Sequence, residues 1–384
     1  MSKRKIIRFG IIGCGLMGRE FASAAARWCH LTDLDAEPQI VAICNRSPEK
    51  FDWFQRSFDT IHLATSDYRE LLADDGVDAV YCALPHNLHA EVYTATLNAG
   101  KHLLGEKPFG IDLAANQQIM QAVRAHPELL VRCSSEFPYF PGAQKIVQFI
   151  REGRFGQIME VHAGLWHSSD LNPHKPINWK RMVEINGEYG CLGDLGMHVV
   201  HIPFRFGWFP KNVRAFLSKI IAQRPDGKGN IVPCKTWDNA TLACEVETGD
   251  QRFPMFLSTK RIAPGEVNTW FIRILGTRFS AEFSTKELRT LKMLSYTPGG
   301  EQSWQHTDLG YESVYRTITG PIFEFGFSDV ILQMIAAFCD ELAHGPNVPF
   351  PCATPEEAAL SHRLFTAALE SQRTGQVINL ADVA

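Results

Sequence analysis

The sequence has little excess charge of either sign. Its 38 lysines and arginines are slightly outnumbered by 42 aspartates and glutamates, which gives a formal net charge of −4. Proteins hold nucleic acids mainly by neutralising phosphates with clustered basic side chains. We therefore expect no nucleic-acid partner.

Long apolar runs are also missing. No stretch of the sequence reaches the roughly 18 consecutive apolar residues that a transmembrane helix needs. The apolar stretch over residues 6–12 is interrupted by Arg8, and it is too short for the hydrophobic region of a signal peptide. We expect neither a membrane-spanning segment nor a membrane partner.

Closely spaced cysteines are absent as well. The chain has 10 cysteines, and no two lie within four residues of each other, so there is no Cys-x-x-Cys pair for zinc or redox chemistry. Cys44 and Cys82 lie inside strand-like runs, where buried thiols are common. This usage is typical of a reducing compartment, and we predict a cytoplasmic protein.

What the chain does have is enough length and apolar content for two cores. Its 384 residues, 45% of them hydrophobic, exceed the roughly 250 to 300 residues at which a single core stops growing. The first third alternates short apolar runs with helical patterns, which predicts a doubly wound parallel sheet. Strands are expected at residues 6–12, 40–44, 79–84, 102–104 and 129–133, and helices at 112–125 and from Pro141 to about residue 153.

The pattern changes after Gly156. Residues 242–247 alternate apolar and polar side chains, which predicts an antiparallel sheet. Residues 331–342 carry an apolar stripe at helical spacing, and residues 354–357 have the form of a capping box with proline at the first helical position. We expect two helices to close the chain.

A glycine-rich segment lies between the first predicted strand and its helix. It consists of Gly13, Cys14, Gly15, Leu16, Met17 and Gly18. This context is the one that a dinucleotide fingerprint requires, because the glycines allow a tight turn and the helix N-terminus offers unpaired N–H groups to a pyrophosphate. The alternative is a glycine-rich turn that only permits close packing of helix and sheet.

Asn45 and Arg46 follow the second strand, where an NAD site usually places a carboxylate against the ribose hydroxyls. Asn45 can hydrogen-bond the ribose, and the missing negative charge would tolerate a 2′-phosphate. We expect NAD as cofactor, with NADP left open. A simple turn is the alternative.

Two further segments end parallel strands at the edge where ligands bind. Pro85, His86 and His89 follow one strand, and Glu106-Lys107-Pro108 follows the next. We predict that Lys107 faces the cofactor. The alternative is a solvated surface charge.

In the second half, Trp179, Lys180 and Arg181 precede a segment that contains Asp194 and His198. If that segment is helical, the carboxylate and the imidazole lie at i and i+4 on one face, as an oriented acid–base catalyst needs. A structural ion pair is the alternative. His201 adds a third polar group, but hydride chemistry with a lysine and a histidine at hand needs no metal, and we expect none.

Together these motifs resemble those of the glucose-fructose oxidoreductase, inositol dehydrogenase and rhizopine-catabolism family (Gfo/Idh/MocA), over essentially the whole chain. The family's glycine motif is matched by Gly13, Gly15 and Gly18, and its P-N-x-x-H turn by Pro85, His86 and His89. Its E-K-P signature is matched at residues 106–108. Its G-x-L-x-D-x-G-x-H signature is matched by Gly190, Leu192, Asp194, Gly196 and His198.

The resemblance implies a Rossmann domain over residues 1–135 and an α+β domain over residues 136–384 with a large, mostly antiparallel open sheet. It implies a cis peptide bond at Lys107-Pro108 and catalysis by Lys107, Asp194 and His198. The cofactor would contact the glycine segment, Asn45, Arg46, Pro85, His86, His89, Glu106 and Lys107, and the substrate would contact Lys107, Trp179, Lys180, Arg181, Asp194 and His198. A homodimer or homotetramer would form through the C-terminal sheet.

Two departures from the family pattern concern His86, where asparagine is common, and His201, where aspartate is usual. The second puts the substrate in doubt rather than the reaction. The segment from His167 to Arg181 has a formal charge of +2, so we keep an anionic sugar open beside a plain solvated loop.

We predict hydride transfer between a nicotinamide and a hydroxyl-bearing carbon of a sugar, glycoside or polyol. Two alternatives belong to other classes. One is an NAD-dependent glycosidase that works by oxidation, elimination, hydration and reduction. The other is a non-catalytic NAD(P)-binding regulator, against which the complete set of Lys107, Asp194 and His198 weighs.

Overall fold

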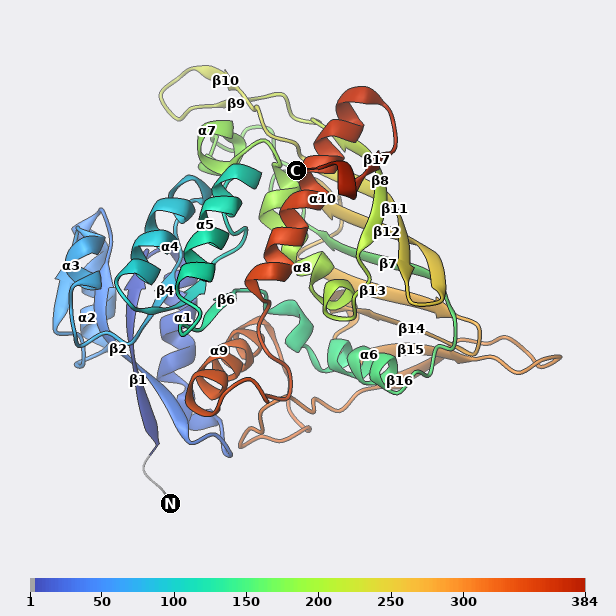
Figure 1. Ribbon diagram of the computed structural model, residues 1–384, viewed down its shortest axis with the longest axis horizontal. Coiled ribbons are helices and arrows are strands. Elements are labelled where there is room, and N and C mark those ends of the chain that lie inside the picture. The colour runs from blue at the N-terminus through green and yellow to red at the C-terminus, as the bar shows by residue number, and fades with distance from the viewer. Residues whose placement is uncertain (1–3, 384) are drawn as a thin grey trace. The chain divides into compact units, whose positions relative to one another are not determined.

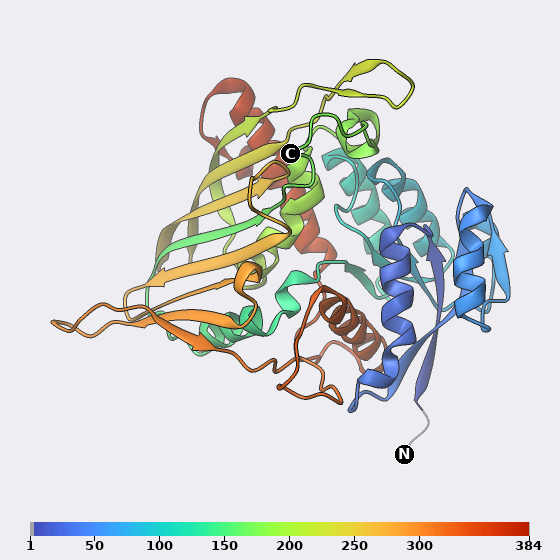
Figure 2. The same ribbon diagram turned by 180° about the vertical axis from the view of Figure 1, so that it is seen from behind.

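The computed structural model describes residues 4–383, and these form two compact units. The first unit contains the described residues up to Tyr139 together with Tyr311–Ala358. The second contains Phe140–Gly310 and the described residues from Ala359 onward. Each unit has its own sheet (Figures 1 and 2).

The sheet of the first unit is parallel, with strand order β3-β2-β1-β4-β5-β6. This is the order of a dinucleotide-binding doubly wound fold, and it confirms the predicted fold class. The strands are β1 (Lys5–Ile12), β2 (Ala36–Cys44), β3 (Leu63–Thr65), β4 (Ala79–Cys82), β5 (His102–Gly105) and β6 (Val131–Cys133). The helices of this unit are α1 (Leu16–Ala26), α2 (Phe51–Ser57), α3 (Tyr68–Leu72), α4 (His89–Asn98), α5 (Leu113–Ala125) and α9 (Phe327–His344), with short 3-10 turns η1 (Trp28–His30), η2 (Pro48–Lys50), η3 (His86–Leu88) and η4 (Phe137–Tyr139).

Helix α9 belongs to this unit although it lies far away in the sequence. The ring of Phe9 on β1 lies 5.0 Å from that of Phe21 on α1 and 5.9 Å from that of Phe338 on α9. The division expected from the sequence, with all of residues 136–384 in the second domain, therefore differs from the compact units. The apolar stripe of α9 buries its side chains against α1 and β2, and this assigns residues 311–358 to the first unit.

The sheet of the second unit is mixed and mostly antiparallel, in the order β16-β15-β14-β13-β7-β12-β11-β8-β17, with one parallel pair, β7 and β12. Its strands are β7 (Ile158–Trp166), β8 (Pro210–Ser218), β11 (Asn239–Thr248), β12 (Gln251–Lys260), β13 (Thr269–Gly276), β14 (Phe279–Ser284), β15 (Thr290–Ser295), β16 (Gln305–Asp308) and β17 (Ile378–Asn379), and β9 (Gln223–Pro225) pairs with β10 (Ile231–Pro233) separately. The helices are α6 (Pro141–Arg151), α7 (Val183–Asn186) and α8 (Cys191–Arg205), with the short turns η5 (Trp179–Arg181), η6 (Thr285–Glu287) and η7 (Leu380–Asp382). Helix α10 (Pro355–Thr374) begins among residues of the first unit and continues into the second.

Alternation along the strands places one face of this sheet against helices. On β12, Met255 and Leu257 are buried and Phe256 and Ser258 are only half-buried. Helix α8 packs on the buried face and contacts β7, β11 and β12. The predicted alternation over residues 242–247 is confirmed, because Leu242, Cys244 and Val246 are buried.

The local signals for helix ends are confirmed where they were clear. The carboxylate of Asp112 accepts the N–H of Ala115 at 2.8 Å at the start of α5, and Pro141 is the first residue of α6. At the start of α10, Thr354 N–H donates to Glu357 Oε2 at 2.9 Å, and Glu357 N–H donates to Thr354 Oγ1 at 3.2 Å. The short strand β3 was missed, since three residues are too few for a periodic signal.

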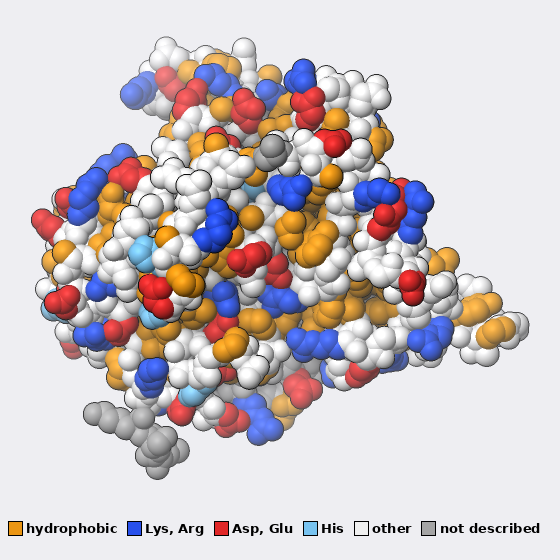
Figure 3. Space-filling view, in the orientation of Figure 1, with side chains coloured by type: hydrophobic (Ala, Val, Ile, Leu, Met, Phe, Trp, Pro, Cys, Tyr) orange, Lys and Arg blue, Asp and Glu red, His pale blue; other side chains and the backbone are white. Residues whose placement is uncertain are grey.

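Charged side chains of both signs are interspersed on the face of the molecule in Figure 3. In the part of the chain that the structure describes, no helix is long and apolar enough to cross a membrane. No cysteine among residues 4–383 forms a disulfide, and all cysteines but the exposed Cys29 are buried.

Candidate functional site

The glycine-rich segment turns sharply between β1 and α1. Gly13 has φ +106°, and a Cβ there would lie 2.3 Å from the carbonyl oxygen of Ala83. A Cβ on Gly18 would lie 2.2 Å from the carbonyl oxygen of Gly13. Neither position therefore accepts a side chain, and both glycines are needed for the packing of the turn.

Gly15 differs from these two glycines. It is the N-cap residue of α1, and a Cβ there would meet nothing within 4 Å. The next residue, Leu16, is 74% exposed, and the first turn of α1 contains no acidic residue. The segment thus presents an open, uncrowded helix N-terminus, which fits the pyrophosphate of a dinucleotide.

Asn45 joins the end of β2 to this segment. Its Oδ1 accepts the N–H of Cys14 at 3.1 Å, and its Nδ2 donates to the carbonyl oxygen of Ser47 at 3.0 Å. The side chain is half-buried, whereas the neighbouring Arg46 is exposed. Asn45 therefore stabilises the turn, as the structural alternative expects, and it also lies beside the open helix end.

The turn after β4 is held mainly from inside the protein. His89 is fully buried, its Nδ1 lies 2.5 Å from the carbonyl oxygen of Pro108, and its Nε2 lies 2.9 Å from that of Leu84. Burial lowers the pKa of His89 to about 4, although the two carbonyls oppose this. The ring of His89 thus lies between the turn after β4 and the loop after β5, and in its neutral form it donates to one of the two carbonyl oxygens. Pro85 is half-buried and His86 is buried at the start of η3.

The loop after β5 carries the predicted lysine. Lys107 is half-buried, and its peptide bond to Pro108 is cis, which confirms the expected isomer. Before it, Glu106 is buried, and its Oε1 accepts the hydroxyl of Tyr81 at 2.7 Å while its carbonyl oxygen accepts that of Tyr93 at 2.6 Å. Glu106 is thus anchored in the core, and Lys107 follows directly on a braced loop.

A second buried carboxyl, Glu136, lies in the same unit. Burial raises the pKa of Glu136 to about 7, and the charge of Glu106 adds to this rise, while Lys107 opposes it. Sequence reasoning did not single out Glu136, because nothing in its local pattern indicates a second carboxylate nearby.

Helix α8 holds the other predicted catalytic residues. Its N-cap Gly190 has φ +56°, and a Cβ there would lie 2.5 Å from the backbone nitrogen of Trp237. A Cβ on Gly196 would lie 2.4 Å from the ring of Phe365. The two glycines of the motif therefore let α8 approach its neighbours closely. Asp194 and His198 are both buried on this helix, one turn apart, as expected.

Asp194 is held by two cations. Lys180 Nζ lies 2.8 Å from its Oδ1, and the guanidinium of Arg261 donates to its Oδ2. One turn further along α8, the carbonyl oxygen of His198 accepts the indole N–H of Trp270 at 2.9 Å. His201 is fully buried, with its Nε2 3.1 Å from Arg205, which can only donate. Among residues 4–383, no group of three or more His, Cys, Asp or Glu side chains is arranged to hold a metal ion.

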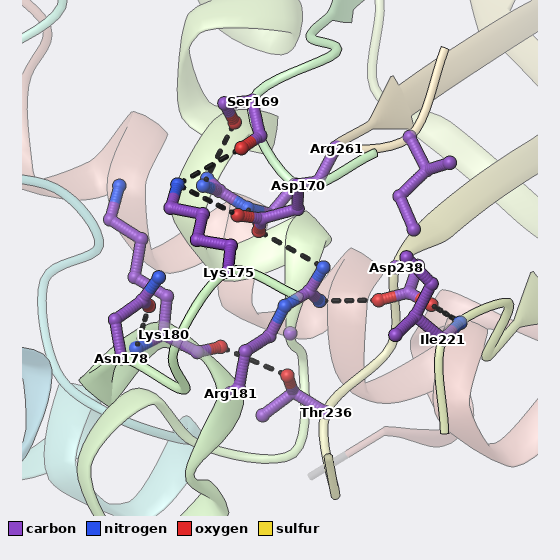
Figure 4. A network of polar contacts seen from close by, with 12 residues as sticks. Ser169, Asp170, Lys175, Asn178, Lys180, Arg181, Ile221, Thr236, Asp238 and Arg261 are labelled. Carbon is purple, nitrogen blue, oxygen red and sulfur yellow. Dashed lines mark hydrogen bonds and ion pairs between the residues drawn. The ribbon is translucent and has the colours of Figure 1, made fainter. Parts of the chain in front are cut away.

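The ion pairs continue away from α8 (Figure 4). Arg261 Nε donates to Asp170 Oδ2 at 2.7 Å, Arg181 lies 3.0 Å from the same oxygen, and the other end of the Arg181 guanidinium lies 2.5 Å from Asp238. Asp170, Arg181 and Asp238 are each about 1% exposed. Burial raises the pKa of Asp170, but the charges and hydrogen bonds of its cations outweigh this and bring it to about 2.

The solvated loop expected from His167 to Arg181 is found only in part. Residues 171–174 are exposed, but Asp170 and Arg181 are buried in ion pairs. Lys180 and Trp179 are only half-buried. Sequence reasoning missed Arg261, directly after β12, and Asp238, directly before β11, because no local pattern reveals their partners.

The predicted catalytic set comes from both units. Lys107 belongs to the first unit, and Asp194 and His198 belong to the second.

Comparison with known proteins finds similar oxidoreductases. Residues 7–132 match the profile of GFO_IDH_MocA, an oxidoreductase family with an NAD-binding Rossmann fold. A levoglucosan dehydrogenase of Pseudarthrobacter phenanthrenivorans is 29% identical over 221 residues, which cover 57% of this chain and 56% of that protein. A scyllo-inositol 2-dehydrogenase (NADP(+)) of Bacillus subtilis is 26% identical over 228 residues, which cover 59% of this chain and 66% of that protein. The aligned parts thus span less than two thirds of these relatives.

Solved structures share the fold over nearly the whole length. A levoglucosan dehydrogenase in complex with NADH has a TM-score of 0.86 at 23% identity and covers 98% of this chain and 99% of its own. An inositol dehydrogenase homologue from Azotobacter vinelandii, complexed with NAD+, has a TM-score of 0.76 at 19% identity and covers 98% of each chain. Residues 7–132 therefore match the GFO_IDH_MocA family of oxidoreductases with an NAD-binding Rossmann fold, and the chain as a whole shares the fold of these solved structures.

Proposed function

We propose that this protein is an NAD(P)-dependent dehydrogenase that acts on a hydroxyl-bearing carbon of a sugar or polyol. The observation that carries the proposal is the open helix end at Gly15, between two glycines that admit no side chain. Such an opening serves a dinucleotide and has no purpose in a turn that only packs helix on sheet. The names of the relatives, levoglucosan dehydrogenase and scyllo-inositol 2-dehydrogenase, support the substrate class.

Each residue of the catalytic set has a distinct task in this proposal. A bound nicotinamide supplies or accepts the hydride. Lys107, as an ammonium, stabilises negative charge on the reacting oxygen. His198 accepts the proton of the hydroxyl, directly or through Lys107, and Asp194 binds a neighbouring hydroxyl as an acceptor.

We propose NAD as the cofactor used, held by the glycine segment and by Asn45. Position 45 is an asparagine and has no carboxylate to repel a 2′-phosphate. A cofactor titration therefore has NADP binding as its other outcome. We also propose that the protein works in the cytoplasm.

A homodimer or homotetramer through the C-terminal sheet is a further part of the proposal. The half-buried face of that sheet has a cavity of about 570 Å³, lined by Trp166, Phe256 and Phe271 among charged side chains. An aromatic centre with a polar rim is typical of protein interfaces. Light scattering of the purified protein and of Phe271→Glu tests this, and a monomeric wild-type protein would contradict it.

Turnover with a substrate panel tests the activity. The purified protein is incubated with NAD or NADP and with neutral sugars, polyols, anionic sugars and chromogenic glycosides in deuterated water. We expect reduced nicotinamide in stoichiometric amount to oxidised sugar. Release of aglycone in excess of cofactor, with deuterium at the carbon beside the anomeric centre, would instead establish the glycosidase. Cofactor binding without turnover of any compound would favour the regulator.

A further inference from the structure

The carboxylate of Asp194 is both buried and doubly bound. It is 1% exposed, it lies in the first turn of α8, and it contacts Lys180 through one oxygen and Arg261 through the other. Lys180 is 30% exposed, whereas Arg261 is 7% exposed. Since water screens an exposed ammonium more than a buried guanidinium, Arg261 is the stronger and more fixed of the two partners.

The position of Arg261 is determined by the sheet rather than by α8. It follows β12 directly, and its N–H donates to the carbonyl oxygen of Asp238 at 2.9 Å and to Oδ1 of Asn239 at 3.1 Å. Asn239 also accepts the N–H of Ile262 at 3.1 Å. The backbone of Arg261 is therefore hydrogen-bonded to the start of β11, and its side chain reaches Asp194 from this fixed position.

The same guanidinium also holds the loop after β7. Arg261 Nε donates to Asp170 Oδ2 at 2.7 Å, and Arg261 Nη2 donates to Ser169 Oγ at 3.2 Å. Figure 4 shows Arg261 and Arg181 meeting at Asp170. From the other side, Arg224 is 1% exposed and donates to the carbonyl oxygens of Asp170 and, at 2.6 Å, Asn172.

We propose that Arg261 is a positioning residue for the reaction, which holds Asp194 as an oriented carboxylate and couples it to Asp170 in the loop after β7. The proposal rests on the proposed function, in which Asp194 binds a substrate hydroxyl. The planar fork of an arginine presents its N–H donors in fixed directions, so it orients both carboxylates, whereas a lysine ammonium is a rotating point charge that attracts them without fixing their geometry.

Several charged or titratable groups surround Asp194. Lys180 approaches it from η5 and Arg261 from the end of β12, while Asp170, Arg181 and Asp238 form the next layer behind Arg261. On α8 itself, Cys191 and His198 lie one turn away on either side. Burial raises the pKa of Cys191 to about 12, so this thiol stays neutral.

Removal of Arg261 should therefore have a specific electrostatic effect. A buried carboxyl resists ionisation unless cations compensate. Without Arg261, Asp194 loses its more deeply buried cation, and its pKa should rise. Without Asp170, by contrast, Arg261 has Asp194 as its main carboxylate partner, and the pKa of Asp194 should not rise. If Arg261 had only a structural role, loss of Arg261 and loss of Asp170 would not change the pKa of Asp194 in different directions.

The experiment compares Arg261→Gln, Arg261→Lys and Asp170→Asn with the wild-type protein. Arg252→Gln, at the exposed start of the same strand, is the matched control. Side-chain carboxyl carbons of 13C-labelled aspartates are followed by NMR from pH 2 to 8, and the Asp194 signal is assigned with Asp194→Asn. This readout needs neither substrate nor activity.

We expect the Asp194 signal to titrate at least about one pH unit higher in Arg261→Gln than in the wild-type protein, and not higher in Asp170→Asn or Arg252→Gln. In the active protein, the acid limb of kcat should move up in the same variant, with kcat lowered about 10-fold or more. Arg261→Lys should keep the titration but lower kcat, because an ammonium lacks the fixed fork that orients Asp194 relative to Asp170.

Two results would overturn the inference: an Asp194 titration in Arg261→Gln that matches the wild type, or the same upward shift in Asp170→Asn. If Arg261→Gln does not fold, as judged by thermal unfolding, a wild-type kcat in Arg261→Lys would have the same consequence. A wild-type protein that turns over no sugar or polyol would contradict the proposed function separately, because the NMR titration does not depend on it.

Discussion

The side-chain oxygen of Asn45 accepts the backbone N–H of Cys14 at 3.1 Å, and this bond joins the end of β2 to the glycine-rich segment. Asn45 thus combines two tasks at one position. It stabilises the turn through its oxygen and stands where a ribose would be bound. A substitution that keeps the acceptor and adds a charge separates the two.

We predict that Asn45→Asp raises the preference for NADH over NADPH about 10-fold. The carboxylate can still accept from Cys14, but it repels a 2′-phosphate. Fluorescence titrations give both dissociation constants, and thermal unfolding checks the turn. An unchanged ratio of the two constants would mean that Asn45 does not contact the ribose.

The glycines offer a second test. Gly15→Ala should leave the melting temperature unchanged, because the added methyl group meets nothing within 4 Å, yet it should weaken NADH binding about 10-fold or more by obstructing the pyrophosphate. Gly18→Ala is the matched variant. Its methyl group would lie 2.2 Å from the carbonyl oxygen of Gly13, so it should destabilise the protein by about 1 to 3 kcal/mol. Normal cofactor affinity in Gly15→Ala would restore the purely structural alternative.

Lys107→Met and His198→Asn should each lower turnover about 100-fold or more, while cofactor affinity changes little. Both side chains are assigned to the reacting hydroxyl and neither to the pyrophosphate. Lys211→Met removes a half-exposed lysine on β8 and serves as control. Steady-state rates with the best substrate of the panel decide this, and wild-type rates in both variants would refute the catalytic assignment.

Glu136 should make the stability of the protein depend on pH. Its pKa is raised from 4.5 to about 7 by burial and by Glu106, so the folded protein holds this proton more tightly than the unfolded chain. Its contribution therefore becomes less favourable as pH rises from about 4.5 through 7. Glu136→Gln stays neutral, and its free energy of unfolding should gain up to about 3 kcal/mol on the wild type across this window. Denaturant titrations of the cofactor-free proteins at pH 4.5, 6 and 8 measure the difference. A difference independent of pH would show that Glu136 ionises normally.

Much of the fold follows from local patterns in the sequence. The alternation in residues 242–247 and the helical stripe of residues 331–342 each report which side chains are buried, and burial depends on neighbours a few positions away. The glycine segment was placed by its motif instead, and the helix that carries Asp194 and His198 was only assumed, because every residue from Cys191 to Phe204 is buried and no one-sided pattern marks it. Apolar residues recur along a strand or helix at every position that faces the core, so the sequence alone shows which face is buried.

Other features depend on residues that meet only in the folded chain. Arg261 is 67 residues from Asp194 and 91 from Asp170, and no period links such positions. The sequence therefore left the segment from His167 to Arg181 as a charged loop, and it grouped α9 with residues 136–384, whereas the contacts of α9 group it with the first compact unit. An ion pair is determined by distance in space and by how far water is excluded. Only the tertiary structure decides these, because it brings charges from separate loops and helices into one buried cluster.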